Sequence, residues 1–301
     1  MIQALSIYIA ARAFSEKPAS GFSENSVSVT PTQPKITQVL LENPMKLYVI
    51  NLDCSKDRLE HITAVFHERG LDFERVPAVD GRILPEEVFR RLASNRNWPL
   101  ELTRTEVGCF LSHRECLRLV AEANDAYGAI FEDDIILSPN APLFLKDWSW
   151  IPADIDIVKI DTAEISCLTG RVSAKLKANY RLAPLISKHY CAAGYIVSKS
   201  CARHLYELTE HTTAPIDEIY FNPDCHVLQT LNVQQMIPAP VMQAGLISTI
   251  RNNVEKKIRQ PSRLPLTRKM KREIERINKK HLRNMRIYLF SRKRWGKITF
   301  K

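Results

Sequence analysis

The chain from residue 46 onward alternates between short apolar runs and longer amphipathic stretches, a pattern that few folds accommodate. Residues 47–52 (LYVINL) are almost continuously apolar, as expected of a strand buried on both faces. Alternating strand and helix patterns are typical of an α/β domain with a mainly parallel central sheet. We therefore predict strands at 47–52, 73–79, 129–131, 155–160 and 193–197, and helices at 55–69, 85–92 and 103–123.

The predicted domain covers residues 45–253, and the two ends differ from it in composition. Residues 1–44 are rich in Ser, Thr, Pro and Gln and lack sustained periodicity, so we expect a disordered extension. An alternative interpretation is that Met45 is the natural start of translation and that the preceding residues are an over-long reading of the gene. Since 45% of the 301 residues are hydrophobic, the chain can bury one large core.

Residues 254–301 form a basic tail, in which apolar residues recur near helical spacing. The formal net charge of the chain is +10, and this tail supplies the excess of Lys and Arg. We predict a basic amphipathic helix that binds an acidic membrane surface. A nucleic-acid-binding arm and a solvated helix packed on its own domain are the alternatives.

Cysteine usage and the lack of a long apolar segment point to a cytoplasmic protein. The 7 cysteines are scattered and include no CxxC pair, so we expect reduced thiols. No stretch reaches the roughly 18 apolar residues that a membrane span requires. The apolar opening of the chain is short and lacks a convincing cleavage site. Together with the basic tail, these features predict a cytoplasmic location, peripheral on the inner membrane.

An acidic triplet, Glu132, Asp133 and Asp134, follows the apolar strand 129–131. Residues two apart in an extended chain point to the same side, so Glu132 and Asp134 can converge while Asp133 turns away. Two carboxylates on one side suit a hard cation such as Mn²⁺ or Mg²⁺. Ligands bind outside the carboxyl ends of strands in open α/β sheets, which favours a metal site over a solvated strand end.

The first strand ends in a comparable group of polar residues, Asn51 and Asp53, with Arg58 in the helix that follows. Asn51 and Asp53 could hydrogen-bond a nucleoside, and Arg58 could bind a phosphate. The simpler interpretation is a solvated turn between a strand and a helix.

Two further places carry residues suited to binding or proton transfer. Ser112 and His113 lie in the helix 103–123, where His113 shares an apolar stripe and is either a core imidazole or a donor-binding residue. Asp217 and Glu218 follow a proline and begin a helix. A carboxylate there acts either as a general base or as a favourable charge at a helix N-terminus.

Eight sequence blocks in family order resemble glycosyltransferase family 25, which includes lipooligosaccharide galactosyltransferases and collagen galactosyltransferases. The blocks are VINLDCSKDRLE, FERVPAVDG, LTRTEVGCFLSH, AIFEDDIIL, DIVKID, AAGYIVSK, PID and QAGLISTI. They span about residues 45–253 and leave both ends uncovered. Cys54 stands where many relatives carry a basic residue, and the family pattern does not explain the basic tail.

The resemblance implies a GT-A-like nucleotide-sugar-binding fold and an inverting transfer of galactose or glucose from a UDP-sugar to a lipooligosaccharide or other glycan or glycolipid acceptor. It implies Mn²⁺ held by Glu132 and Asp134, and Asp217 is the candidate base. The implied donor-binding residues are Asn51, Asp53, Arg58, Ser112 and His113, with Lys159 as a further cation for the diphosphate.

Two rival functions use some of the same features. A metal-dependent nucleotidyltransferase would also need carboxylates and a nucleotide, but it would release pyrophosphate. A nucleic-acid-binding protein would explain the basic tail, but it leaves the acidic strand ends without a role, which argues against nucleic acid as the partner.

Overall fold

The computed structural model describes residues 44–93, 102–210, 214–223, 230–245 and 293–301. The predicted disordered extension lies outside the described residues, except for Pro44, and so does most of the basic tail. The account below concerns the single compact unit to which the described residues belong. No helix in the described ranges is long and apolar enough to cross a membrane.

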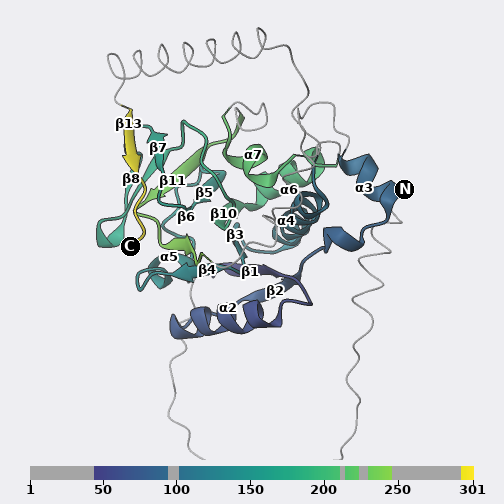
Figure 1. The fold of residues 1–301 in the computed structure, drawn as a ribbon. Coiled ribbons are helices and arrows are strands. Elements are labelled where there is room, and N and C mark those ends of the chain that lie inside the picture. The colour runs from purple at the N-terminus through teal and green to yellow at the C-terminus, as the bar shows by residue number, and fades with distance from the viewer. Residues whose placement is uncertain (1–43, 94–101, 211–213, 224–229, 246–292) are drawn as a thin grey trace, which may run out of the picture. The chain divides into compact units, whose positions relative to one another are not determined.

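An eight-stranded sheet forms the centre of the domain, in the order β2-β1-β3-β10-β5-β11-β9-β8 (Figure 1). Its strands are β1 (Lys46–Asn51), β2 (Glu74–Pro77), β3 (Tyr127–Glu132), β5 (Ile157–Lys159), β8 (Ala174–Lys175), β9 (Arg181–Pro184), β10 (Gly194–Ser198) and β11 (Val233–Ile237). Six of them run in one direction, while β9 and β10 run in the other. This confirms the predicted α/β class, and the predicted strands correspond to β1, β2, β3, β5 and β10.

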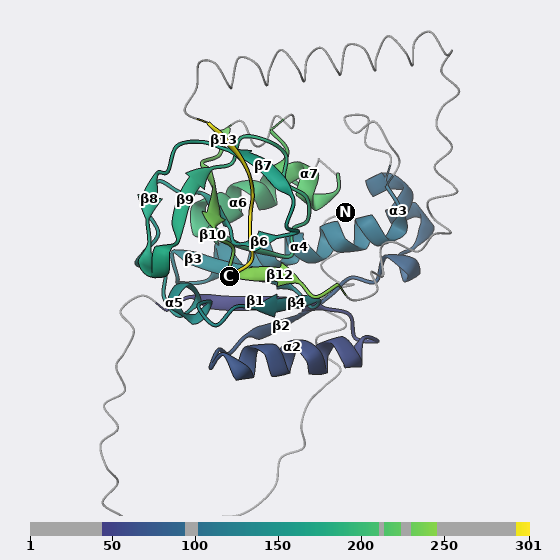
Figure 2. The ribbon, with the colours of Figure 1, turned by 60° about the vertical axis from the view of Figure 1, so that its left-hand side comes forward.

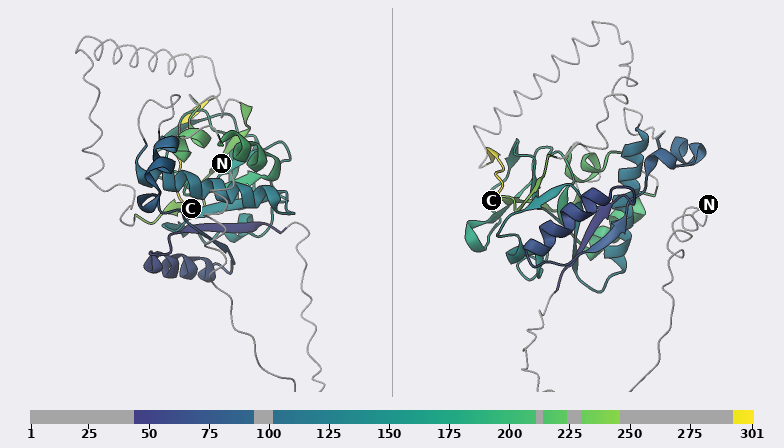
Figure 3. Two further views of the ribbon diagram at one scale, coloured as in Figure 1. Left: turned by 90° about the vertical axis from the view of Figure 1, so that its right-hand side faces the viewer. Right: turned by 60° about the horizontal axis from the view of Figure 1, so that its bottom comes forward.

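Helices cover both faces of the sheet. Helix α2 (Lys56–Glu68) lies on one face, whereas α4 (Arg104–Glu122), α6 (Lys199–Leu208) and α7 (Ile216–Phe221) lie on the other (Figures 1 and 2). The left view of Figure 3 shows the same layers, with the purple helix α2 beneath the sheet and the blue α4 above it. Strands covered on both sides must be apolar on both faces, which explains the run in β1.

The core forms where alternate strand residues meet these helices. Phe66 of α2 is buried and packs edge-on against Phe131 of β3, with ring centroids 5.4 Å apart. On the other side, α4 begins with the predicted capping box, because Thr103 and Glu106 each accept the other's backbone N–H. The remaining helical segments are η1 (Gly81–Ile83), α3 (Glu86–Ala93), α5 (Pro142–Leu145) and η2 (Lys177–Asn179).

Two glycines let α4 approach the loop after β2 very closely. A Cβ on Gly108 would lie 2.5 Å from the backbone oxygen of Val79, and one on Gly81 would lie 1.7 Å from that of Arg104. Both distances are far shorter than a real contact, so only glycine fits at these positions. Ser112 strengthens the same junction, because its Oγ accepts a 2.9 Å hydrogen bond from the backbone N–H of Val79.

The end of the chain differs from the prediction of a helical tail through residue 301. Strand β13 (Arg294–Lys297) pairs antiparallel with β7 (Ser166–Thr169), and Ile298 is buried. The helix prediction is therefore wrong for residues 294–297. These residues belong to the domain, although the sequence predicted that the domain ends at residue 253. The rest of the predicted helix lies outside the described residues.

A three-stranded sheet completes the fold, with β4 (Ile135–Leu137), β12 (Val241–Gln243) and β6 (Asp161–Thr162).

Candidate functional site

The site lies at the edge of the sheet where β1 and β3 end. Ile50 of β1 pairs in register with Glu132 of β3, so the polar residues after both strands reach the same edge. Strand β10 begins there, since Gly194 is the partner of Phe131 and the carbonyl of Ala193 accepts from the N–H of Glu132 at 3.1 Å. This is the position where ligands bind in open α/β sheets.

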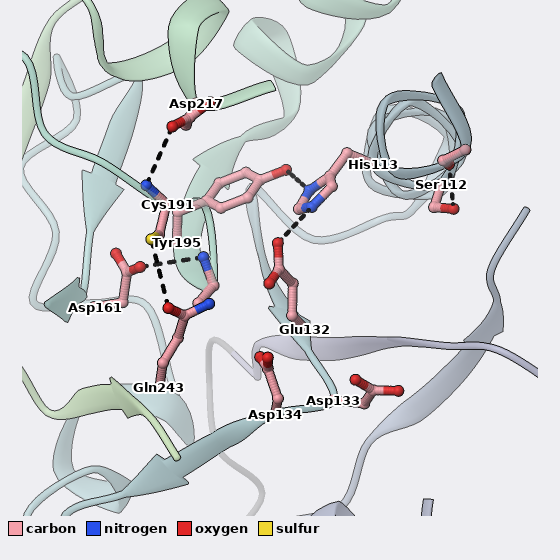
Figure 4. A network of polar contacts seen from close by, with 12 residues as sticks. Ser112, His113, Glu132, Asp133, Asp134, Asp161, Cys191, Tyr195, Asp217 and Gln243 are labelled. Atoms are coloured by element: carbon pink, nitrogen blue, oxygen red, sulfur yellow. Dashed lines mark hydrogen bonds and ion pairs between the residues drawn. The ribbon is translucent and has the colours of Figure 1, made fainter. Parts of the chain in front are cut away.

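The three carboxylates of the acidic triplet point in different directions, and the chain bends at Asp133 and Asp134 after β3 ends. Asp133 turns toward β1, where it accepts hydrogen bonds from Asn51 Nδ2 at 2.7 Å and Arg58 Nη1 at 2.8 Å. Glu132 and Asp134 point elsewhere, as Figure 4 shows. In the structure, Asn51 and Arg58, which we predicted to contact the donor, hold the middle carboxylate at the end of β1.

Asp134 is an incompletely satisfied carboxylate. It is 8% exposed, and its buried Oδ1 has no hydrogen-bond partner in the described part of the chain. Burial is the main cause that raises the pKa of Asp134 to about 7, and the charge of Glu132 is the next cause. Arg58 opposes that rise, with Nη1 3.9 Å from Asp134 Oδ2. A hard divalent cation would satisfy the bare oxygen and relieve the repulsion, so Glu132 and Asp134 fit the predicted metal.

His113 and Ser112 point in different directions although they are adjacent. The buried imidazole of His113 places Nδ1 3.0 Å from the hydroxyl of Tyr195 and Nε2 3.5 Å from Oε1 of Glu132. Ser112 Oγ donates to the carbonyl of Gly108 at 2.7 Å and points away from the carboxylates (Figure 4). The structure thus brings His113 into the site, while Ser112 holds the junction between α4 and the loop after β2.

The turn after β1 is held by an arginine that the sequence reasoning missed. Arg75 of β2 donates to Asn51 Oδ1 at 3.0 Å and to Asp53 Oδ1 at 2.6 Å. The side chain of Asp53 is 45% exposed, so it remains accessible at the rim. Arg75 stands at alternate strand spacing in FERVP, but only its position beside β1 shows which residues it contacts.

Lys159 does not lie free to bind a diphosphate. Its ammonium is fully buried and contacts Asp161 Oδ1 at 2.5 Å, the carbonyl of Cys191 at 2.6 Å and the ring of Phe221 at 4.1 Å. Asp161 also accepts from the backbone N–H of Ala193 at 3.1 Å. These contacts use the donors of the ammonium, so we withdraw the diphosphate role and assign Lys159 to positioning the segment before β10.

Asp217 enters the site from the first turn of α7. Its Oδ2 accepts from the backbone N–H of Cys191 at 3.3 Å, and Figure 4 shows it on the α7 side of that segment, with Glu132 and Asp134 on the β3 side. Burial raises the pKa of Asp217, with the charge of Glu218 as the next cause. Glu218, the other carboxylate, pairs with Lys188 and accepts from Asn222, so it is the weaker candidate for a base.

Cys191 and Gln243 are further members of this site that the sequence did not reveal. Cys191 has φ 67°, a conformation uncommon for residues other than glycine, and its sulfur lies 3.5 Å from Gln243 Oε1. The 6 cysteines within the described ranges are free thiols, as predicted for them.

Comparison with known proteins identifies the family of the chain. Residues 45–220 match the family described as glycosyltransferase family 25 (LPS biosynthesis protein). The chain is similar to the lacto-N-neotetraose biosynthesis glycosyltransferase LgtB of Neisseria gonorrhoeae, with 30% identity over 60% of this chain and 68% of the relative. It is also similar to the lipooligosaccharide biosynthesis protein lex-1 of Haemophilus influenzae, with 28% identity over 64% of this chain and 67% of the relative.

A solved structure of a glycosyltransferase involved in glycosylation of the major capsid of PBCV-1 superposes with a TM-score of 0.40 and 11% identity, over 71% of this chain and 99% of that one. The family match covers more than half of the 301 residues and includes every residue assigned above to the site except Gln243. The chain therefore belongs to glycosyltransferase family 25, and it is a glycosyltransferase.

Proposed function

We propose that the protein transfers galactose or glucose from a UDP-sugar to a lipooligosaccharide or LPS-type acceptor, with inversion at the anomeric carbon. The observation that carries the proposal is the pair formed by Glu132 and Asp134, in which a buried carboxylate oxygen has no partner among the described residues. The name of the relative lex-1, a lipooligosaccharide biosynthesis protein, supports a lipooligosaccharide acceptor. A GT-A-like mode of donor binding accounts for the metal pair and the polar end of β1 lying at one edge of the sheet.

The donor side of the site consists of Glu132, Asp134 and the turn after β1. Glu132 and Asp134 would hold Mn²⁺, or Mg²⁺, which when bound supplies the positive charge that stabilises the leaving diphosphate. Arg58 is held 2.8 Å from Asp133, beside that pair, and adds a fixed positive charge there. Asp53 is exposed at the rim and Asn51 is fixed by Arg75, so the turn is preorganised for a nucleoside.

The acceptor side depends on Asp217. An inverting transfer needs a base on the face of the sugar opposite the leaving group. Asp217 would remove the proton of the acceptor hydroxyl while the new bond to the anomeric carbon forms and the bond to UDP breaks. The raised pKa of Asp217 makes it a stronger proton acceptor than an exposed aspartate. The backbone N–H of Cys191, held through Lys159, fixes the orientation of this carboxylate.

In this proposal the basic segment, which we define as residues 254–292, holds the enzyme near a lipid-linked acceptor. Strand β12 precedes the segment and β13 follows it, and both pair within the domain, so the segment is attached to the domain at both ends. Its Lys and Arg residues would hold the protein at the cytoplasmic face of an acidic membrane. Flotation with acidic vesicles should weaken as salt rises, whereas equal binding to neutral vesicles would contradict an electrostatic attachment.

A donor screen tests the function directly. UDP-galactose, UDP-glucose and other nucleotide sugars are incubated with the full chain, with and without Mn²⁺, and release of UDP is measured with and without a lipooligosaccharide acceptor. We expect UDP release from one of the two UDP-hexoses that depends on Mn²⁺ and increases with acceptor. Release of pyrophosphate from a nucleoside triphosphate, with no UDP release from any sugar nucleotide, would instead identify a nucleotidyltransferase.

A further inference from the structure

A cysteine, a histidine and a glutamate converge beside the carboxylate pair. Cys109 and His113 are four residues apart on α4 and so lie on one side of the helix, facing Glu132 at the end of β3. One ligand atom from each, a sulfur, an imidazole nitrogen and a carboxylate oxygen, lies within 4.8 Å of the other two. Three donors of different chemistry within this distance resemble an incomplete coordination shell.

The imidazole of His113 is already oriented as a ligand. Its Nδ1 is engaged by Tyr195 Oη at 3.0 Å, and the two rings stack with centroids 5.8 Å apart. Nε2 is buried, has no hydrogen-bond partner within the described residues and points toward Glu132 (Figure 4). Metal-binding histidines commonly have one nitrogen fixed in this way by a second group, which leaves the other nitrogen for the metal.

The electrostatic surroundings favour a cation over an empty cluster. The carboxylate of Glu132 is one of the three donors, and Asp134 and Asp217 belong to the same site (Figure 4). Their carboxylates would stabilise a divalent ion placed between Cys109, His113 and Glu132. Such an ion would also stabilise the thiolate, because a coordinating thiol is deprotonated by its metal.

We propose that Cys109, His113 and Glu132 bind a thiophilic divalent cation such as Zn²⁺. The donor set of one sulfur, one nitrogen and one oxygen differs from the oxygen pair of Glu132 and Asp134, and it selects Zn²⁺ over Mg²⁺. On binding, the thiol of Cys109 would lose its proton to solvent as the bond between the sulfur and the metal forms.

Glu132 belongs to both donor sets, which gives the thiophilic site a regulatory consequence. Engagement of Glu132 by Zn²⁺ together with Cys109 and His113 would draw its carboxylate toward α4 and away from the pair with Asp134. Zn²⁺ therefore inhibits the Mn²⁺-dependent transfer by competition for this carboxylate. This second part rests on the proposed function, whereas the binding of the thiophilic cation does not.

Cobalt(II) tests the site without any substrate, because a cobalt–thiolate bond gives a near-ultraviolet charge-transfer absorption. The full chain is titrated with Co²⁺ in the absence of UDP. We expect the absorption in the wild type and in Cys54→Ser, the matched change at an exposed thiol, and its loss in Cys109→Ser. Absence of the absorption in the wild type, or its persistence in Cys109→Ser, would overturn the proposal.

Glu132→Gln provides a second variant that keeps the thiol and alters a partly exposed side chain. It should weaken Co²⁺ binding by about 10-fold or more, since changes in the shell beyond the ligands already cost that much. Unchanged affinity would remove Glu132 from the site. Circular dichroism shows whether Cys109→Ser folds. If it does not, Glu132→Gln still tests whether the cation binds at this site.

Zinc inhibition is then measured at a fixed Mn²⁺ concentration, with each variant compared to its own uninhibited rate. We expect Cys109→Ser to need at least about 10-fold more Zn²⁺ for half inhibition. Equal sensitivity would contradict the sharing of Glu132.

Asp134→Asn separates the two proposals: it should keep the cobalt absorption while losing Mn²⁺-dependent UDP binding. Loss of the absorption in a folded Asp134→Asn would overturn the separate thiophilic site, and retained UDP binding would overturn the proposed donor site.

Discussion

The amide of Asn51 donates a 2.7 Å hydrogen bond to Asp133, and this contact joins the ends of β1 and β3. Because Arg58 binds the other oxygen of Asp133, the middle carboxylate of the triplet serves the structure while its neighbours remain for chemistry. A single acidic motif thus separates into one residue that orders the site and two whose carboxylates we propose to hold the metal.

Asp133→Ala should lower the free energy of unfolding by roughly 2–4 kcal/mol, because it removes the carboxylate that accepts from Arg58 at 2.8 Å and from Asn51 at 2.7 Å. The side chains of Arg58 and Asp133 are only 12% and 10% exposed, so water cannot fully replace the pair. Chemical denaturation measures the change. Asp72→Ala, at an exposed aspartate, is the control and should stay within about 0.5 kcal/mol of the wild type. Equal stabilities would mean that Asp133 does not order the site.

Gly108→Ala tests the close approach of α4 to the loop after β2. Alanine normally stabilises a helix relative to glycine by about 1 kcal/mol. Here the new Cβ would lie 2.5 Å from the backbone oxygen of Val79, so we expect a loss of about 1–3 kcal/mol instead. Gly296→Ala, where a Cβ meets nothing within 4 Å, is the matched control. A stabilised Gly108→Ala protein would show that the junction is looser than described.

The buried imidazole of His189 predicts acid sensitivity. Burial, and then the charge of Lys159, lowers the pKa of His189 from 6.5 to about 3. Between these two pH values the unfolded chain therefore binds a proton at His189, whereas the folded chain does not. The contribution of His189 to stability is present above the unfolded pKa and is lost as pH falls from about 6.5 toward 3, by at most ~1.4 kcal/mol per pH unit.

His189→Asn removes the group that takes up the proton. The free energy of unfolding should therefore depend less steeply on pH between about 6.5 and about 3. His204→Asn, at an exposed histidine, should leave the slope unchanged. Urea denaturation at several pH values gives both slopes. Identical slopes for the wild type and His189→Asn would show that His189 takes up a proton in the folded state as readily as in the unfolded one.

Asp217→Asn should bind UDP and Mn²⁺ like the wild type but transfer sugar about 10²- to 10⁴-fold more slowly, the range that a positioned base supplies. A base must be unprotonated to act, and the pKa of Asp217 is raised. The wild-type rate should therefore fall, as pH decreases, at a pH above the usual ~3.9 of aspartate. Turnover kinetics against pH provide the measurement. A rate within a few-fold of the wild type would remove Asp217 as the base.

Local signals in the sequence predicted those parts of the fold that neighbouring residues determine. The capping box at Thr103 and Glu106 located the start of α4, and the apolar run before Glu132 located β3. The alternation of side chains along an extended chain predicted that Asp133 turns away from Glu132, but the chain bends at residues 133 and 134, so this rule does not by itself explain the orientations.

The residues that were missed depend on contacts between distant segments. Arg75 reaches Asn51 only through the pairing of β2 with β1, and Tyr195 reaches His113 only because β10 lies beside β3. The ion pair between Lys159 and Asp161 does have a local signal, since the two residues are two positions apart and lie on the same side of an extended segment. The basic composition of the tail concealed β13, although Trp, Ile, Thr and Phe in RWGKITF favour a strand.

Calorimetry of UDP binding to Asp134→Asn, with and without Mn²⁺, tests the central claim most directly. Asparagine keeps the shape of the side chain but removes the charge that the metal requires. We predict that the wild type binds UDP more tightly with Mn²⁺ present and that Asp134→Asn loses most of this gain while its fold is retained. If folded Asp134→Asn binds UDP and Mn²⁺ as tightly as the wild type, the carboxylate pair of Glu132 and Asp134 is not the metal site of this glycosyltransferase.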